Sequence, residues 1–176
     1  MPLYIDETPA IAISTLSNRA RRIKRLFGLS LIVVDYIQLM KTNTNKLDGR
    51  VQEISEITQG LKALAKELNV PVLALSQLSR AVEQRDDKKP QLSDLRESGS
   101  IEQDAYVVLF VYREQYYLEK KEPKQGSIEH AEWQSKMSDI HGLADIIVGK
   151  HRHGSTGVVH LEFEGMYTKF KDLKKN

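Results

Sequence analysis

The chain has 176 residues, of which 40% are hydrophobic and 28% are charged, with 26 Lys and Arg against 24 Asp and Glu. This composition is typical of one folded domain with its own core, and it favours a globular class over an intrinsically disordered one. No cysteine is present, which excludes disulfides and cysteine-based zinc sites, and no apolar run approaches the roughly 20 residues that a membrane span needs.

The first segments predict a short strand, a helix and a second strand. Residues 3–5 favour a strand, and Ser14 is a candidate N-cap for a helix over 15–27, with Gly28 just past its end. The run "LSLIVVD" is dense in β-branched residues and predicts a strand over 30–35.

The next segments predict a longer helix and another strand. Residues 50–69 carry one apolar stripe at helical spacing, formed by Val51, Ile54, Ile57, Leu61, Leu64 and Leu68. Pro71 then opens "PVLALSQ", which shows no alternation of apolar and polar residues. This pattern predicts a parallel strand that is covered on both faces.

The remaining segments predict one short helix, one long helix and four strands. Ser100 with Gln103 resembles a capping box, and a helix after Ser127 is expected to stop at Gly142. The predicted strands cover residues 105–112, 143–150, 157–164 and 166–170. Strand and helix alternate first and strands follow, so we expect an α/β fold with a mainly parallel sheet that ends in antiparallel edge strands.

Polar residues at strand ends are the first candidate site, because ligands of open α/β sheets bind outside the carboxyl ends of the strands. Asp35 ends one predicted strand and could hold Mg²⁺ through water. Gln77 ends the next one and could hydrogen-bond a γ-phosphate or an attacking water. The alternative is that Asp35 caps a turn and Gln77 pairs with backbone, and the two interpretations stay open.

A glycine-rich phosphate loop is missing from the sequence. No G-x-x-x-x-G-K-[ST] motif exists, and the glycines of "GLADIIVGKH" enclose an apolar strand that cannot wrap its amides around phosphates.

The segment "KHRHGSTG" places Lys150 and Arg152 on one side of an extended chain, which suggests a phosphate or an acidic partner. The alternative is a solvated edge. His151 and His153 also share a face, but two histidines without a third ligand are more often surface residues than a metal site.

A third candidate is "DLRESGSIEQDA", over 94–105. Its exposed amides and Arg96 could contact a phosphate backbone, although an ordinary loop before a helix would look the same.

Taken in order, these segments resemble DnaB-type replicative DNA helicases, which are hexameric motors with a RecA-like P-loop NTPase core. The matching stretches are "LIVVDYIQLM", "EISEITQGLKALAKELNVPVLALSQLSRAVEQR", "LSDLRESGSIEQDA" and "KHRHGSTGVVHLEFEGMYTKF". The resemblance covers nearly the whole chain, and it implies that residues 1–176 are the carboxyl-terminal part of a RecA-like ATPase domain.

The resemblance also implies roles for the catalytic candidates. Asp35 would be the Walker B acid that holds Mg²⁺ through water, and Gln77 would be a polar sensor of the γ-phosphate. Lys150 and Arg152 would be the finger pair that reaches the nucleotide of a neighbouring subunit.

The implied binding partners are single-stranded DNA, ATP with Mg²⁺, other copies of the chain in a homo-hexamer ring, a primase and a helicase loader. Arg96, Glu97 and Gly99 would lie on the loop that binds single-stranded DNA. The amino terminus has no basic segment followed by an apolar one, so we expect a cytoplasmic protein without a membrane partner.

The sequence departs from the family's pattern at three places. Ser155 stands where proline is usual, and the segment 118–142 is longer than in many relatives. The family's amino-terminal domain, P-loop and catalytic glutamate lie upstream of the matching stretches, so we expect a fold truncated at its amino terminus and weak or no ATP hydrolysis by the chain alone. The alternatives are a non-enzymatic fragment that binds DNA or helicase subunits and, less favoured, another RecA-like ATPase such as a recombinase.

Overall fold

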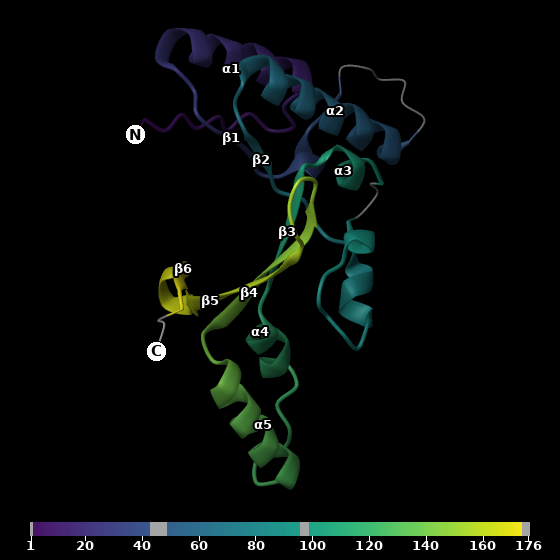
Figure 1. The fold of residues 1–176 in the computed structure, drawn as a ribbon. Coiled ribbons are helices and arrows are strands. Elements are labelled where there is room, and N and C mark those ends of the chain that lie inside the picture. The colour runs from purple at the N-terminus through teal and green to yellow at the C-terminus, as the bar shows by residue number, and fades with distance from the viewer. Residues whose placement is uncertain (1, 43–48, 96–98, 174–176) are drawn as a thin grey trace. The chain divides into compact units, whose positions relative to one another are not determined.

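The computed structural model describes residues 2–42, 49–95 and 99–173 (Figure 1). The chain forms two compact units. The first unit comprises Met1–Ser79 and Ser93–Ala105, and the second comprises Arg80–Leu92 and Tyr106–Asn176.

Two helices, α1 (Ile13–Phe27) and α2 (Arg50–Leu68), lie side by side in the first unit (Figure 1). Helix α1 begins after Ala12 without a side-chain cap, so the prediction of Ser14 as N-cap is wrong. The stop at Gly28 is confirmed, because this residue has a φ of +78°, which glycine adopts readily. Residues 3–5 form no strand, contrary to the prediction.

The apolar stripe of α2 forms the core of this unit. Its buried members are Ile54, Ile57, Leu61 and Leu64, whereas Val51 is mostly exposed in the first turn. The structure confirms this helix at its predicted position. The prediction succeeded because the apolar residues that face the core recur at helical spacing. It ends at Asn69, whose backbone is left-handed, two residues before Pro71.

Strands β1 (Ile32–Val34) and β2 (Val72–Ala74) form a two-stranded parallel sheet, with Val34 opposite Ala74. The predicted parallel pairing is therefore confirmed. The prediction of cover on both faces is wrong for this unit, because Val33 is 55% exposed and Leu73 is 52% exposed.

Short helical turns connect the longer elements. The first unit contains η1 (Ile37–Leu39) and α3 (Gly99–Asp104), and the second unit contains η2 (Arg80–Gln84). Within η3 (Leu92–Asp94) the chain passes from the second unit to the first. Ser100 is the second residue of α3, not the residue before it, and its Oγ has no hydrogen-bond partner in the described part of the chain. The predicted capping box is therefore wrong.

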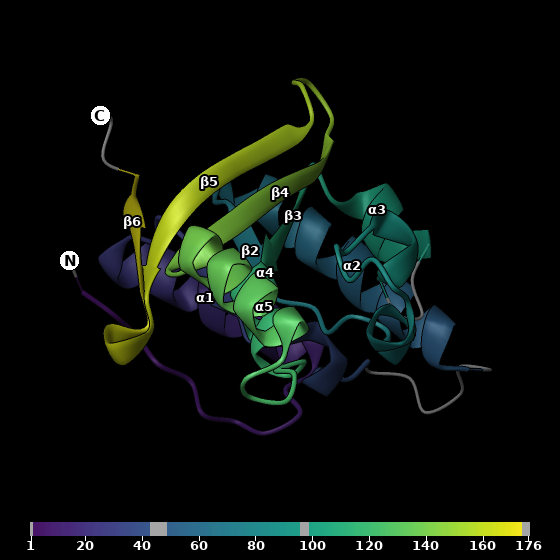
Figure 2. The same ribbon diagram turned by 90° about the horizontal axis from the view of Figure 1, so that it is seen from below.

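The second unit contains a four-stranded antiparallel sheet in the order β3-β4-β5-β6 (Figure 2). Its strands are β3 (Val107–Tyr112), β4 (Leu143–His151), β5 (Gly157–Glu164) and β6 (Lys169–Asp172), with η4 (Gly165–Tyr167) before the last. The last strand begins later than predicted because residues 165–167 form a turn. Along β3, buried and exposed residues alternate, which a strand covered on one face requires.

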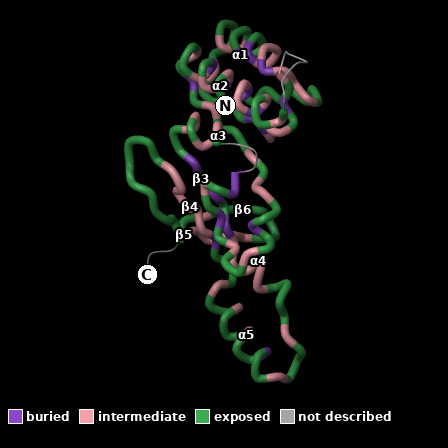
Figure 3. The backbone as a smooth tube through the Cα atoms, turned by 90° about the vertical axis from the view of Figure 1, so that its right-hand side faces the viewer, coloured by how far each residue is buried: buried purple, intermediate pink, exposed green. Residues whose placement is uncertain are grey.

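Helices α4 (Glu114–Glu119) and α5 (Ile128–Ile140) pack together between β3 and β4 in the chain. Helix α4 was not predicted. Ser127 caps α5 as predicted, since its Oγ accepts from the His130 amide at 3.1 Å. The Trp133 indole donates to the Leu118 carbonyl at 2.9 Å, which joins the two helices. Figure 3 shows that most of α5 is exposed.

The α/β class and the order of parallel before antiparallel strands are confirmed. The strands are divided between two sheets, however, and parallel pairing is limited to β1 and β2 among the described strands.

Candidate functional site

The carboxyl end of β1 carries Asp35 directly after the strand. The chain then turns at once, because Ile37 in η1 is only 1% exposed and its amide donates to the Leu75 carbonyl at 3.0 Å. The peptide bond between Asp35 and Tyr36 is cis. Asp35 itself is exposed, and no hydrogen bond or ion pair joins its carboxylate to another described residue. Its carboxylate oxygens are therefore accessible to a hydrated cation.

The carboxyl end of β2 carries Ser76 and Gln77. Since Val34 lies opposite Ala74 in the parallel register, Asp35 and Gln77 follow neighbouring strands at the same edge of the sheet. The Gln77 side chain belongs to an exposed residue. The structure thus brings together the two strand ends that the sequence singled out, and the chemical roles of the two residues stay predictions.

Gln38 was missed by sequence reasoning. Its side-chain amide bonds the segment after β2: Nε2 donates to the Ser76 Oγ at 2.9 Å, and Oε1 accepts from the Gln77 amide at 3.2 Å. The available signal was a single amide in the apolar run "YIQLM" just after a strand. That signal is weak, because it does not say which distant segment the amide meets.

Lys150 and Arg152 lie in the second unit, at the end of β4. Lys150 pairs with Val108, and the Arg152 amide donates to the Tyr106 carbonyl at 2.9 Å. The Arg152 guanidinium lies 4.6 Å from the centroid of the Tyr106 ring, within range of a cation–π contact. The extended spacing of the two cations agrees with the predicted pattern, whereas their role as a finger pair stays a prediction.

Gly149, the glycine of "VGKH", lies within strand β4. The register of β3 and β4 shifts between Val108 and Leu109, opposite this glycine. A Cβ at Gly149 would lie 2.6 Å from the Cε2 of Phe110, a buried ring. The glycine therefore serves close packing at a β-bulge next to Lys150.

Of the predicted DNA-contacting residues, Arg96 and Glu97 lie outside the described residues. Gly99 is the first residue of α3, and it is exposed. Helix α3 is bound to α2 through Asp104, which accepts from the Thr58 hydroxyl at 2.8 Å and from the Lys62 ammonium at 3.3 Å. These two bonds fix the end of the short helix that follows the predicted DNA loop.

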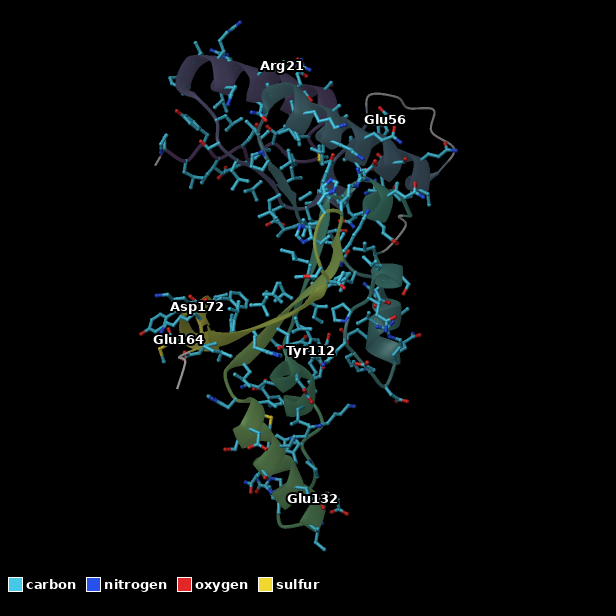
Figure 4. The ribbon with its side chains drawn as sticks, in the orientation of Figure 1. Arg21, Glu56, Tyr112, Glu132, Glu164 and Asp172 are labelled. Atoms are coloured by element: carbon cyan, nitrogen blue, oxygen red, sulfur yellow. The ribbon has the colours of Figure 1, made fainter. Side chains whose placement is uncertain are left out.

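The second unit also contains an aromatic cluster, and Figure 4 labels its central member, Tyr112. Burial raises the pKa of Tyr112 to about 12, and the carboxylates of Glu114 and Asp87 act in the same direction. The Tyr117 ring stacks on it with centroids 5.7 Å apart. The Tyr117 hydroxyl donates to Glu83 at 3.3 Å, so the charged segment over 80–92 is bound to this cluster.

Residues 2–42, 49–95 and 99–173 contain no group of three or more potential metal-ligating side chains. In this same part of the chain, no helix is both long and apolar enough to cross a membrane.

The sequence matches one protein family over nearly its whole length. Residues 1–172 match the family described as the DnaB-like helicase C terminal domain. The chain belongs to this family. Replicative DNA helicase DnaB of Rickettsia felis is 57% identical over 175 residues, which are 99% of this chain and 35% of that protein. The corresponding protein of Geobacillus stearothermophilus is 47% identical over 173 residues, or 98% of this chain and 34% of that protein.

Two solved structures have the same fold. One is described as "The Structure Of A DnaB-Like Replicative Helicase And Its Interactions With Primase", with a TM-score of 0.77 and 38% identity over 93% of this chain and 36% of that one. The other is a solved ATPase domain, also with a TM-score of 0.77 and 38% identity, over 93% of this chain and 52% of that one. The DnaB-like, RecA-like fold class is therefore established. The chain spans about a third of the length of the curated relatives.

Proposed function

We propose that this chain is the carboxyl-terminal part of a replicative helicase motor, in which ATP hydrolysis drives translocation on single-stranded DNA and duplex unwinding. The observation that supports this most is the family match over residues 1–172. The exposed carboxylate and amide at neighbouring strand ends, Asp35 and Gln77, agree with it.

In this proposal Asp35 holds a hydrated Mg²⁺. A single exposed carboxylate suits that ion, which takes oxygen ligands and keeps most of its water. When bound, Mg²⁺ neutralises charge on the phosphates of ATP. The amide of Gln77 orients a phosphate oxygen or a water molecule by hydrogen bonding.

Lys150 and Arg152 would act on the nucleotide of a neighbouring copy in a homo-hexamer. Positive charge at the transferring phosphate is worth about 10³ to 10⁵ in rate in this class of reaction. Arg96, Glu97 and Gly99 would contact the backbone of single-stranded DNA. A primase is a proposed partner because one similar solved helicase is described together with its interactions with primase, and a helicase loader is proposed from the family alone.

The test uses a chimaera, because the sequence contains no glycine-rich phosphate loop. In this chimaera the present chain replaces the matching 35% of the Rickettsia felis protein, to which it is 57% identical. Mg²⁺-ATP hydrolysis is measured with and without single-stranded DNA, for the chimaera and for the isolated chain.

We expect DNA-stimulated hydrolysis by the chimaera and little or none by the isolated chain. The Asp35→Asn variant of the chimaera should lose most of its activity, since the neutral amide holds Mg²⁺ poorly. Asp139→Asn, at an exposed position of α5, is the matched control and should change little. An inactive chimaera, or equal activity in the Asp35→Asn variant, would contradict the proposal.

The second candidate is a non-enzymatic module that binds DNA or helicase subunits. Fluorescence anisotropy with labelled single-stranded DNA, with and without ATP, distinguishes the two. Tight binding by the isolated chain, together with an inactive chimaera, would support the binding module.

A further inference from the structure

The backbone pairing between β1 and β2 stops two residues before Gln77. The Leu75 amide donates to the Val34 carbonyl at 2.9 Å, and the Ile37 amide donates to the Leu75 carbonyl at 3.0 Å. From Ile37 onward the first strand's continuation becomes the helical turn η1, so its backbone groups can no longer pair with the neighbouring segment. The peptide groups of Gln77 therefore have no backbone partner in the pairing of β1 with β2.

The side chain of Gln38 provides that partner. Its Oε1 accepts from the Gln77 amide at 3.2 Å, and its Nε2 lies 3.4 Å from the Gln77 carbonyl oxygen. A carboxamide carries one acceptor and one donor face, as a peptide group does, so Gln38 replaces the missing backbone partner. The orientation of the amide is fixed, because the Gln77 N–H can only donate. Nε2 is thereby left for the Ser76 hydroxyl, at 2.9 Å.

Gln38 is itself held from two sides. The neighbouring Ile37 is almost fully buried, and the Arg50 guanidinium donates to the Gln38 carbonyl. Arg50 also forms an ion pair with Glu53 in the first turn of α2. The start of α2, the turn after β1 and the segment after β2 are thus joined through one glutamine.

We propose that Gln38 is a positioning residue, which fixes the backbone of Gln77 so that the exposed Gln77 side chain can couple the nucleotide to DNA. This rests on the proposed function, in which the Gln77 side chain orients a phosphate oxygen or a water molecule. Gln38 acts through Gln77 and Ser76, since its own amide is used by these contacts.

Three variants test the proposal. Gln38→Met keeps the length of the side chain and removes both hydrogen-bonding groups. Gln38→Glu keeps an acceptor for the Gln77 amide and is the conservative variant. Gln59→Met is the matched control, because the Gln59 amide also donates to a serine hydroxyl, that of Ser55 at 3.3 Å, but within α2 and on an exposed surface.

The first measurement is hydrogen exchange of the Gln77 amide in the full chain. Gln38→Met should lower its protection about fivefold, which corresponds to one typical hydrogen bond. Gln38→Glu and Gln59→Met should retain protection. Unchanged protection in Gln38→Met would overturn the proposal, whether or not the chimaera hydrolyses ATP.

The second measurement is the ratio of hydrolysis rates with and without single-stranded DNA in the chimaera. Gln38→Met should lower this ratio severalfold, whereas Gln59→Met should leave it unchanged. An inactive chimaera with native Gln38 would contradict the proposed function, and hydrogen exchange alone would then decide the positioning role. If protection falls in Gln38→Met and the ratio does not, Gln38 has only a structural role and the proposal is wrong.

Discussion

The contact between α1 and α2 in the first unit can be tested at Gly60. A Cβ at this position of α2 would lie 2.6 Å from the Cγ1 of Ile13 and 3.3 Å from its Cδ1. Ile13 is buried, and a β-branched side chain has little freedom about χ1, so it cannot move away at low cost. The Gly60→Ala variant therefore combines a steric cost with the gain of a better helix former.

The magnitudes decide the sign of the effect. Overpacking of a core costs about 1 to 3 kcal/mol, whereas replacing glycine by alanine inside a helix gains about 1 kcal/mol. We expect Gly60→Ala to lower the free energy of unfolding by up to about 2 kcal/mol, as the difference of these terms. Urea denaturation followed by circular dichroism in the far ultraviolet measures it.

The Ile13→Ala background provides the control. This substitution removes the Cγ1 and Cδ1 atoms that Gly60→Ala would meet, although by itself it costs about 2 to 5 kcal/mol. In that background Gly60→Ala should stabilise the protein by about 1 kcal/mol, because only the helix propensity remains. A stabilising Gly60→Ala in the native background would refute the close packing of α1 on α2, and an equal effect in both backgrounds would refute the steric argument.

Three further predictions concern stability. Because the pKa of Tyr112 is raised to about 12, the folded state keeps the hydroxyl proton to a higher pH than the unfolded state does. The free energy of unfolding should therefore fall between about pH 10 and 12. Tyr112→Phe should reduce that fall, whereas Tyr167→Phe, at an exposed position, should not. Asp104→Ala should lower the free energy of unfolding by about 1 to 3 kcal/mol in urea denaturation, because α3 loses the bonds that the Asp104 carboxylate accepts from the Thr58 hydroxyl and the Lys62 ammonium of α2. Trp133→Phe should cost about 1 kcal/mol through loss of the indole hydrogen bond, measured by thermal denaturation.

Each of these has a result that would count against it. A pH profile of the Tyr112→Phe variant that falls as steeply above pH 10 as the native profile would assign the fall to another group. An Asp104→Asn variant, which keeps an acceptor for Thr58 but loses the charge beside Lys62, should be affected less than Asp104→Ala, and the reverse order would contradict the role of the Thr58 bond. Unchanged stability of Trp133→Phe would mean that this hydrogen bond adds nothing to the contact of α4 with α5.

Much of the local structure follows from the sequence alone. The stripe of α2, the stop of α1 at Gly28 and the cap of α5 at Ser127 depend on residues within a few positions of each other. The position of Asp35 at a strand end follows in the same way, because an apolar β-branched run ends there. These features need only backbone preferences, side-chain periodicity and short-range hydrogen bonds.

Other features depend on which distant segments meet. Gln38 replaces a backbone partner for Gln77, 39 positions away, and no local pattern selects that partner. Gly60 and Gly149 are needed because side chains from other elements approach their Cα atoms. Whether both faces of β2 are covered depends on its neighbours in space, which is why cover on both faces was wrongly predicted for the apolar run "PVLALSQ". The sequence by itself thus determined the elements and the strand-end residues, whereas the tertiary structure decided how those residues are held.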